Sequence, residues 1–366
     1  MFGSATPSEP PAPRASGSPS RVSGLATALV AALFVLTIGV GLALVYRAAE
    51  RARVVGAPGR PAATPGRPVG AGGAQASGEA DPGAELRVTR RFGATPMLER
   101  QAQVDATPNV LALLSREITV TTSYGGGFVG AIGGVASGYT SSRPVREDWF
   151  YYVNGLQSRV GAGDVSVHAG DRIWWDFHRW DFAASVPAVV GQFPAPFVAA
   201  GRAARATQVL YASGFEIDAR RIASELASAG ASVAAVAPAD AASVARSGHV
   251  VLVGRWADLM GLSAVRDATL ASGASGIFVR FDDSGADALD ELGAVALHVP
   301  AAGAVLATAK PEDPDSGLWL VTGSGVGDVR AAADLLTDGG ARLAGRFGAL
   351  VEPDDAVVSL PIAVGR

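Results

Sequence analysis

The sequence contains no cysteine and only one lysine, Lys310, among its 30 basic residues. The absence of cysteine excludes disulfides, thiolate metal sites, a cysteine nucleophile and the acylated cysteine of a bacterial lipoprotein anchor. The net charge of −4 gives no bulk attraction to nucleic acid, so we expect no nucleic-acid partner. The preference for arginine, beside abundant alanine, glycine and valine, indicates the coding bias of a GC-rich genome, and we expect an actinobacterial source.

One segment is long and apolar enough to cross a membrane. Residues Gly24 to Tyr46 carry no charge. As a helix they would extend roughly 34 Å at ~1.5 Å per residue, which exceeds a hydrocarbon core of ~30 Å. We expect an uncleaved single-pass anchor in the lipid bilayer. The alternative is a cleaved signal peptide, whose apolar region is typically shorter and closer to the start of the chain.

The orientation of this segment is open to two interpretations. Arg14 and Arg21 precede it, whereas Arg47, Arg51, Arg53 and Arg60 follow it. By the positive-inside rule this count favours a cytoplasmic C-terminal portion. The family resemblance described below favours an extracytoplasmic C-terminal portion on the cell membrane, which we adopt as the prediction.

Composition divides the rest of the chain into tails, linkers and two folded parts. Residues 1–23 read as a disordered tail and 47–85 as a linker rich in proline, glycine and alanine. A first domain is expected over 86–181, a second linker over 182–204, and a second domain over 205–366. Residues 86–92, 119–122, 149–153 and 172–180 have the pattern of strands, and 108–117 that of a helix. This order predicts a small α+β domain, β-grasp-like, with its helix on one face of the sheet.

Four blocks of this first domain occur in the order known from one family: TPNVLALL (107–114), FVGAIGGV (128–135), DWFYYVNG (148–155) and VGAGDVSVHAGDRIWWDF (160–177). Together they resemble a bacterial domain of unknown function that is similar to the transcobalamin C-terminal domain. The resemblance implies an extracytoplasmic position, binding of cobalamin or a related ligand, and work beside a vitamin-uptake transporter. The helical barrel that precedes this domain in transcobalamin, and encloses the ligand with it, is absent here.

The strands of this domain are rich in aromatic residues on both faces. Trp149 and Tyr151 share one face, and Phe150 and Tyr152 the other. If one face stays exposed, its rings form a binding surface, for which we select Tyr124, Phe128, Trp149 and Tyr151. The alternative is that loops or the second domain cover these rings.

The histidines of this domain, His168 and His178, are the candidates for a ligand to a metal or to a corrin cobalt. Neither has a second histidine or a carboxylate at metal-ligand spacing, so a purely structural role is the alternative and no metal site is predicted.

Strands alternate with helices over 205–366, which predicts an α/β domain with a largely parallel sheet. Strands are expected at 207–213, 231–237, 249–253, 277–281, 295–299 and 318–321, and helices at 217–229, 286–292 and 328–336. A glycine loop after the last strand contains Gly323, Gly325 and Gly327 and could present backbone N–H groups to a phosphate. It lacks the ending of a P-loop, and the side chain of Asp328 is expected to cap the following helix.

These features predict a membrane-anchored, extracytoplasmic, non-catalytic binding protein for a small molecule such as cobalamin. The alternative is a structural envelope protein that makes protein contacts and binds no small ligand. An enzyme is not expected, because acid–base residues do not cluster.

Overall fold

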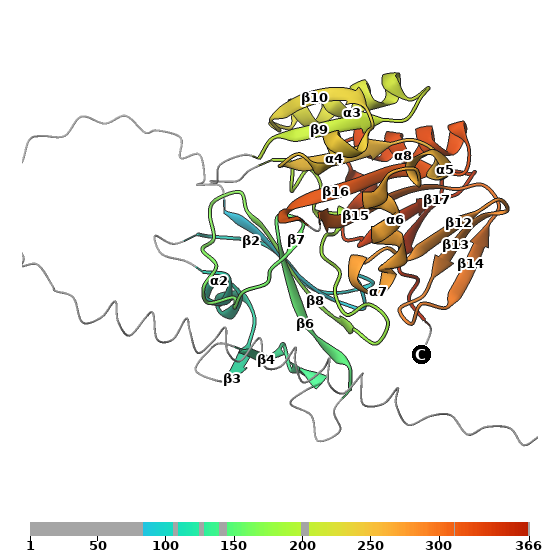
Figure 1. Cartoon of the computed structure of the whole chain (residues 1–366). Coiled ribbons are helices and arrows are strands. Elements are labelled where there is room, and N and C mark those ends of the chain that lie inside the picture. Colours follow the sequence, from blue (N-terminus) through green and yellow to red (C-terminus); the bar gives the residue numbers. More distant parts are fainter. Residues whose placement is uncertain are drawn as a thin grey trace, which may run out of the picture. The chain divides into compact units, whose positions relative to one another are not determined.

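The computed structural model describes residues 83–104, 109–123, 128–138, 145–198, 205–310 and 312–364 (Figure 1). The expected tail over 1–23, the anchor over 24–46 and nearly all of the linker over 47–85 lie outside these residues. Among the described residues, no helix is both long and apolar enough to span a membrane. Residues 76–366 form one compact unit of mixed α and β structure.

The N-terminal part of this unit is a five-stranded sheet with one helix packed against it. Its strands lie in the order β2 (Thr95–Ala102), β1 (Ala84–Arg90), β8 (Arg172–Arg179), β6 (Glu147–Val153) and β7 (Leu156–Gln157). The first and last long strands, β1 and β8, pair in parallel at the centre, and the other pairs are antiparallel. The helix is α2 (Val110–Glu117), and Asn109 caps it by accepting a hydrogen bond from the N–H of Ala112. A small antiparallel sheet accompanies it: β3 (Val120–Ser123), β4 (Phe128–Ile132) and β5 (Val135–Ala136).

The C-terminal part is built on a seven-stranded mixed sheet. Its order is β10 (Val233–Pro238), β9 (Thr207–Tyr211), β11 (His249–Val253), β16 (Asp313–Gly323), β15 (Gly303–Lys310), β17 (Gly348–Val351) and β18 (Val357–Leu360). The pairs from β10 to β16 are parallel, as expected, but those from β16 to β18 are antiparallel. The sheet is therefore mixed, not largely parallel, because all three pairs among β16, β15, β17 and β18 are antiparallel.

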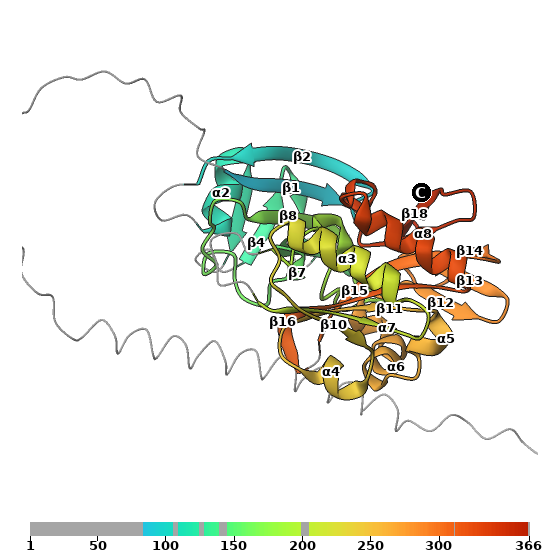
Figure 2. The same cartoon turned by 90° about the horizontal axis from the view of Figure 1, so that it is seen from above.

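Helices cover both faces of this sheet (Figure 2). On one face lie α3 (Glu216–Ser228) and α8 (Val326–Thr337), which contact each other and contribute to one core. On the other lie short helices: α4 (Ala241–Ala245), α5 (Trp256–Leu259), α6 (Ser263–Leu270) and α7 (Ser272–Ser275). The helices predicted at 217–229 and 328–336 are confirmed as α3 and α8.

The predicted helix at 286–292 is wrong. Residues Gly285–Leu289 form strand β13, which pairs on both sides within a separate three-stranded antiparallel sheet. Its neighbours are β12 (Val279–Asp282) and β14 (Val295–Val299), which sequence patterns had indicated as strands. Ala286, Ala288 and Leu289 are buried, so tertiary pairing overrides the helical propensity of an alanine- and leucine-containing segment.

The two parts share a hydrophobic core. One face of the N-terminal sheet packs with α2 and buries Leu86, Leu113 and Trp175 in a core of its own. Tyr152 and Trp174 of the opposite face, with Phe92 of the β1–β2 turn, lie in a core that also contains Phe278 and Phe347 of the C-terminal part. The described residues of all three hydrophobic cores lie within the compact 76–366 unit.

The connection between the two parts is packed against them. Its composition is that of a linker, yet Val186, Ala188, Val190 and Phe197 are buried and belong to the two cores of the C-terminal part. Ala188 also forms a β-bridge with Leu156, and η3 (Val190–Gln192) follows it. Small and aromatic side chains between the prolines give this connection enough apolar surface to be buried.

Candidate functional site

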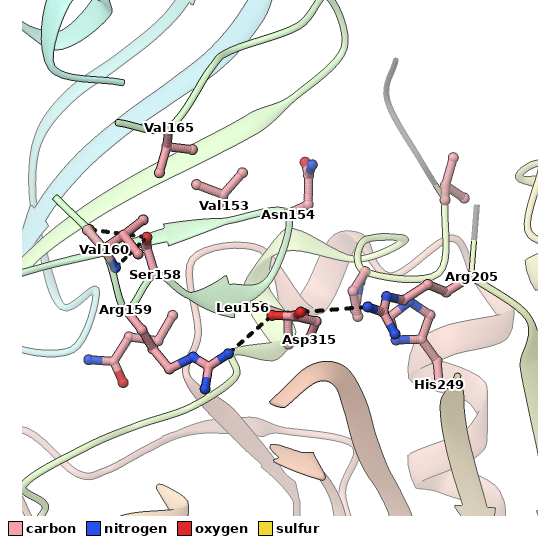
Figure 3. A pocket seen from close by; sticks show the side chains of 13 residues that line it. Val153, Asn154, Leu156, Ser158, Arg159, Val160, Val165, Arg205, His249 and Asp315 are labelled. Carbon is pink, nitrogen blue, oxygen red and sulfur yellow. Dashed lines mark hydrogen bonds and ion pairs between the residues drawn. The ribbon is translucent and has the colours of Figure 1, made fainter. Parts of the chain in front are cut away.

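A cleft of about 510 Å³ lies where the β6–β7 hairpin faces the C-terminal part (Figure 3). Its volume is within the ~300–1,000 Å³ range of small-molecule sites. Apolar side chains supply much of its wall: Val153, Leu156, Val160, Val165, Pro196 and Val198. Polar groups are contributed by the hairpin, by β11 and by the first residues of β16.

The hairpin is held in place by an Asn-Gly turn. Asn154 and Gly155 have φ angles of 51° and 80°, the left-handed region that this dipeptide tolerates. The amide of Asn154 donates to Asp171 at 2.7 Å and accepts from the N–H of Arg172 at 2.8 Å. The N–H of Gly155 donates to the side chain of Gln192 at 2.7 Å. These bonds fix one wall of the cleft against the buried connection.

His249 lines the cleft from the first position of β11. The residue is only 3% exposed, and the N–H of Gly317 donates to its Nδ1 at 3.0 Å. Burial, reinforced by Arg205 and Lys310 and opposed by Asp313, lowers the pKa of His249 to about 4. The imidazole is therefore neutral near pH 7 and carries its proton on Nε2.

Three charged side chains line the cleft. Asp315 lies between two arginines, with Oδ1 at 3.3 Å from Arg159 and Oδ2 at 3.6 Å from Arg205, as Figure 3 shows. Arg205 also contacts Asp313 at 3.0 Å. Exposed pairs at these distances contribute little to stability, about 0–1 kcal/mol. These ion pairs form a polar surface beside the apolar wall, and water or a ligand can replace them at little energetic cost.

A second cleft of about 450 Å³ is lined mainly by charged and backbone groups. Arg87 and Arg172 both border it, but each already has partners. Arg87 pairs with Glu99 at 2.7 Å, and Arg172 donates to the carbonyls of Gln192 and Phe193. With little apolar wall, this cleft is less suited to a small molecule than the first.

The aromatic residues selected from the sequence occupy different surroundings. Trp149 and Tyr151 are buried in the core beside α2, where Trp149 donates to the carbonyl of Val135 at 2.9 Å. Tyr151 stacks on Trp175 with ring centroids 4.7 Å apart, and its hydroxyl donates to the carbonyl of Val160 at 2.6 Å. Phe128 is partly buried at the start of β4, and Tyr124 lies outside the described residues.

The opposite aromatic face is also covered, which is the alternative that the sequence left open. Tyr152 and Trp174 lie at ring-centroid distances of 5.4 and 4.9 Å from Phe347. His178 is stacked between Phe92 and Phe150 at 4.3 and 4.4 Å. The described strands therefore expose no continuous aromatic surface.

Neither histidine of the N-terminal part lies in a metal site. Nδ1 of His178 is 2.8 Å from Asp176, and Nδ1 of His168 is 3.4 Å from Asp171. Within the part of the chain that the structure describes, no group of three or more candidate ligands could hold a metal ion.

The glycine loop of Gly323, Gly325 and Gly327 ends β16 and begins α8. As predicted, Asp328 caps this helix: its carboxylate accepts from the N–H of Gly325 at 2.7 Å. The chain's own carboxylate thus takes a donor that a phosphate would need.

Comparison with protein families finds one match. Residues 109–179 match the model of a domain of unknown function, DUF4430. Comparison with curated proteins finds none that matches the chain. The matched stretch runs from the cap of α2 to the end of β8 and includes the β6–β7 hairpin that forms one wall of the cleft.

Sequence reasoning did not select the residues of the cleft. His249 begins an apolar strand and Asp315 lies among turn residues, so neither stands out in its local sequence pattern. Only the Asn-Gly turn at 154–155 carried a local signal.

Proposed function

We propose that this chain is a membrane-tethered, extracytoplasmic, non-catalytic binding protein that holds a small amphipathic molecule in the 510 Å³ cleft. The observation that carries the proposal is the composition of that cleft. It combines an apolar wall with a few convergent polar groups and a neutral, buried imidazole, as small-molecule sites commonly do.

The topology of the N-terminal part supports the resemblance to the transcobalamin C-terminal domain. The sheet is built from a hairpin, a helix and three further strands, and its first and last strands pair in parallel at the centre, which is the order of a β-grasp sheet. In transcobalamin two domains enclose the ligand, and here the hairpin and the C-terminal part border the cleft together. Cobalamin or a related vitamin is therefore the first ligand class to test, with a vitamin-uptake transporter as the proposed membrane partner.

Occupation of the cleft can be tested with N-phenyl-1-naphthylamine, a neutral dye that fluoresces when it leaves water. Val160 lines the cleft and is 57% exposed, so Val160→Trp should fill the site without disturbing a core. Val295 on β14 is 51% exposed and is absent from the cleft wall, which makes Val295→Trp the matched control.

We expect saturable dye binding to the 76–366 unit and to the Val295→Trp variant, and at least tenfold weaker binding to Val160→Trp. Equal binding by all three proteins would refute the cleft as the binding site. Cyanocobalamin added in a thermal-shift assay tests the finer proposal, because a ligand of the folded state raises the melting temperature.

A structural protein that binds no small ligand is the second candidate. The burial of both aromatic faces favours it, because the rings that first suggested a ligand surface serve as core. If the wild-type 76–366 unit neither binds the dye nor shows a thermal shift with cyanocobalamin, the result would favour a structural protein.

Membrane topology is tested independently. A reporter that is active only in the cytoplasm, fused after Arg366, should be inactive if the C-terminal portion is extracytoplasmic. Full activity would support the arginine count instead.

A further inference from the structure

Two guanidinium groups and one carboxylate line the cleft. They belong to Arg159, Arg205 and Asp315, and His249 beside them is neutral. Arg205 has a second carboxylate partner in Asp313, at 3.0 Å. Arg159 is 62% exposed along its side chain, and Asp315 is the partner it contacts, at 3.3 Å.

Asp315 is placed in the cleft by an irregularity of β16. Lys310 pairs with Asp313 and Ala309 with Gly317, so the residues between Asp313 and Gly317 bulge out of the β15–β16 ladder. A bulge of this kind redirects a side chain away from the plane of the sheet. Here it sets the Asp315 carboxylate between two guanidinium groups that come from distant parts of the chain.

The contacts of Asp315 are loose. Charge-assisted hydrogen bonds to guanidinium groups usually measure about 2.7–2.9 Å, whereas those of Asp315 are 3.3 and 3.6 Å. Its side chain is 66% exposed, so water can replace the arginines at little cost. The anionic group of a ligand can therefore replace the Asp315 carboxylate if it makes shorter contacts with the two arginines.

We propose that the cleft selects amphipathic anions. An apolar body lies on the wall that includes Val153, Val160 and Val165, and one anionic group lies between Arg159 and Arg205 in place of the Asp315 carboxylate. This inference rests on the proposed function of the cleft and specifies its ligand class. Asp315 then acts as an internal competitor that lowers affinity until an anion displaces it.

Two dyes with the same aromatic body separate charge from hydrophobicity. Anilinonaphthalene-1-sulfonate carries a sulfonate, and N-phenyl-1-naphthylamine carries none. The 76–366 unit should bind the sulfonate more tightly than the neutral dye. Arg159→Gln should weaken sulfonate binding by about tenfold or more, the scale of one lost charged hydrogen bond, and leave the neutral dye unaffected. Asp315→Asn should strengthen sulfonate binding.

Arg220 provides the matched control. It is 64% exposed and pairs with Glu216 at 2.7 Å on α3, outside the cleft wall. Arg220→Gln should leave both affinities unchanged, and melting temperatures of all variants establish that they are folded.

The outcomes distinguish this inference from the proposed function. Equal affinities for the two dyes, or equal weakening of both by Arg159→Gln, would overturn anion selectivity while the cleft remains a binding site. Insensitivity of both dyes to Val160→Trp would overturn the site itself, and the inference with it.

Discussion

Acidification should destabilise the protein through His249. Its pKa is lowered to about 4 in the folded state, whereas an unfolded histidine titrates near 6.5. The folded state thus prefers the neutral ring. Its contribution to stability is fully present above pH 6.5 and is lost as the pH falls toward 4.

The size of the effect follows from the two pKa values. Their difference corresponds to about 3 kcal/mol when the titration is complete. Between pH 7.5 and pH 5.0 the folded ring stays neutral while the unfolded one becomes protonated, which lowers the free energy of unfolding by about 2 kcal/mol. Urea denaturation of the 76–366 unit at the two pH values measures this loss.

His249→Asn isolates the contribution of this residue. The asparagine oxygen can still accept the hydrogen bond from the N–H of Gly317, but the side chain does not titrate. The variant should therefore lose about 2 kcal/mol less than the wild type over the same pH range. The other histidines are present in both proteins, so their contributions to the pH dependence of unfolding cancel when the two losses are subtracted. Equal losses in the two proteins would refute the assignment of a buried, neutral His249.

Three further predictions concern the core, the only lysine and the anchor. Trp149→Ala should lower the free energy of unfolding by about 3–5 kcal/mol, because the ring packs on Phe177 in the core; little loss of stability with weaker dye binding would mean a ligand contact instead. Lys310→Met should cost about 1–3 kcal/mol, since Lys310 donates to the carbonyls of Arg246 and Gly248; an unchanged melting temperature would contradict this. Deleting residues 1–47 should move the protein from the membrane fraction to the soluble fraction, and continued pelleting after a high-salt wash would exclude the anchor.

Elements with a strong local pattern could be predicted from the sequence. The helix over 217–229 and the buried strand over 249–253 each combine a clear hydrophobic pattern with turn residues at their ends, and the structure contains both. The helix predicted over 286–292 was wrong because the alanines and leucines of this segment favour a helix, while pairing with a strand on each side imposes β structure on Gly285–Leu289. Strand β15 (Gly303–Lys310), rich in alanine, gave no recognisable pattern, although it is buried in the middle of the sheet.

The cleft could not be predicted because its parts are brought together only by tertiary structure. Arg159 follows the hairpin, His249 begins a strand about 90 residues later, and Asp315 lies on a bulge further along. In the sequence, each of these residues fits an ordinary structural role in its own segment. The aromatic alternation of β6, in contrast, correctly assigned rings to the two faces of the sheet, but it could not show that both faces are covered.

The aromatic layer shared by the two parts bears on how such a chain can evolve. The family match ends at residue 179, yet Tyr152 and Trp174 within it are shielded from water by Phe347. Recombination that transferred the matched stretch alone would expose this aromatic face to water and make the isolated domain prone to aggregation. We therefore expect relatives that lack the C-terminal part to carry polar residues at positions 152 and 174, or to acquire another partner that covers them.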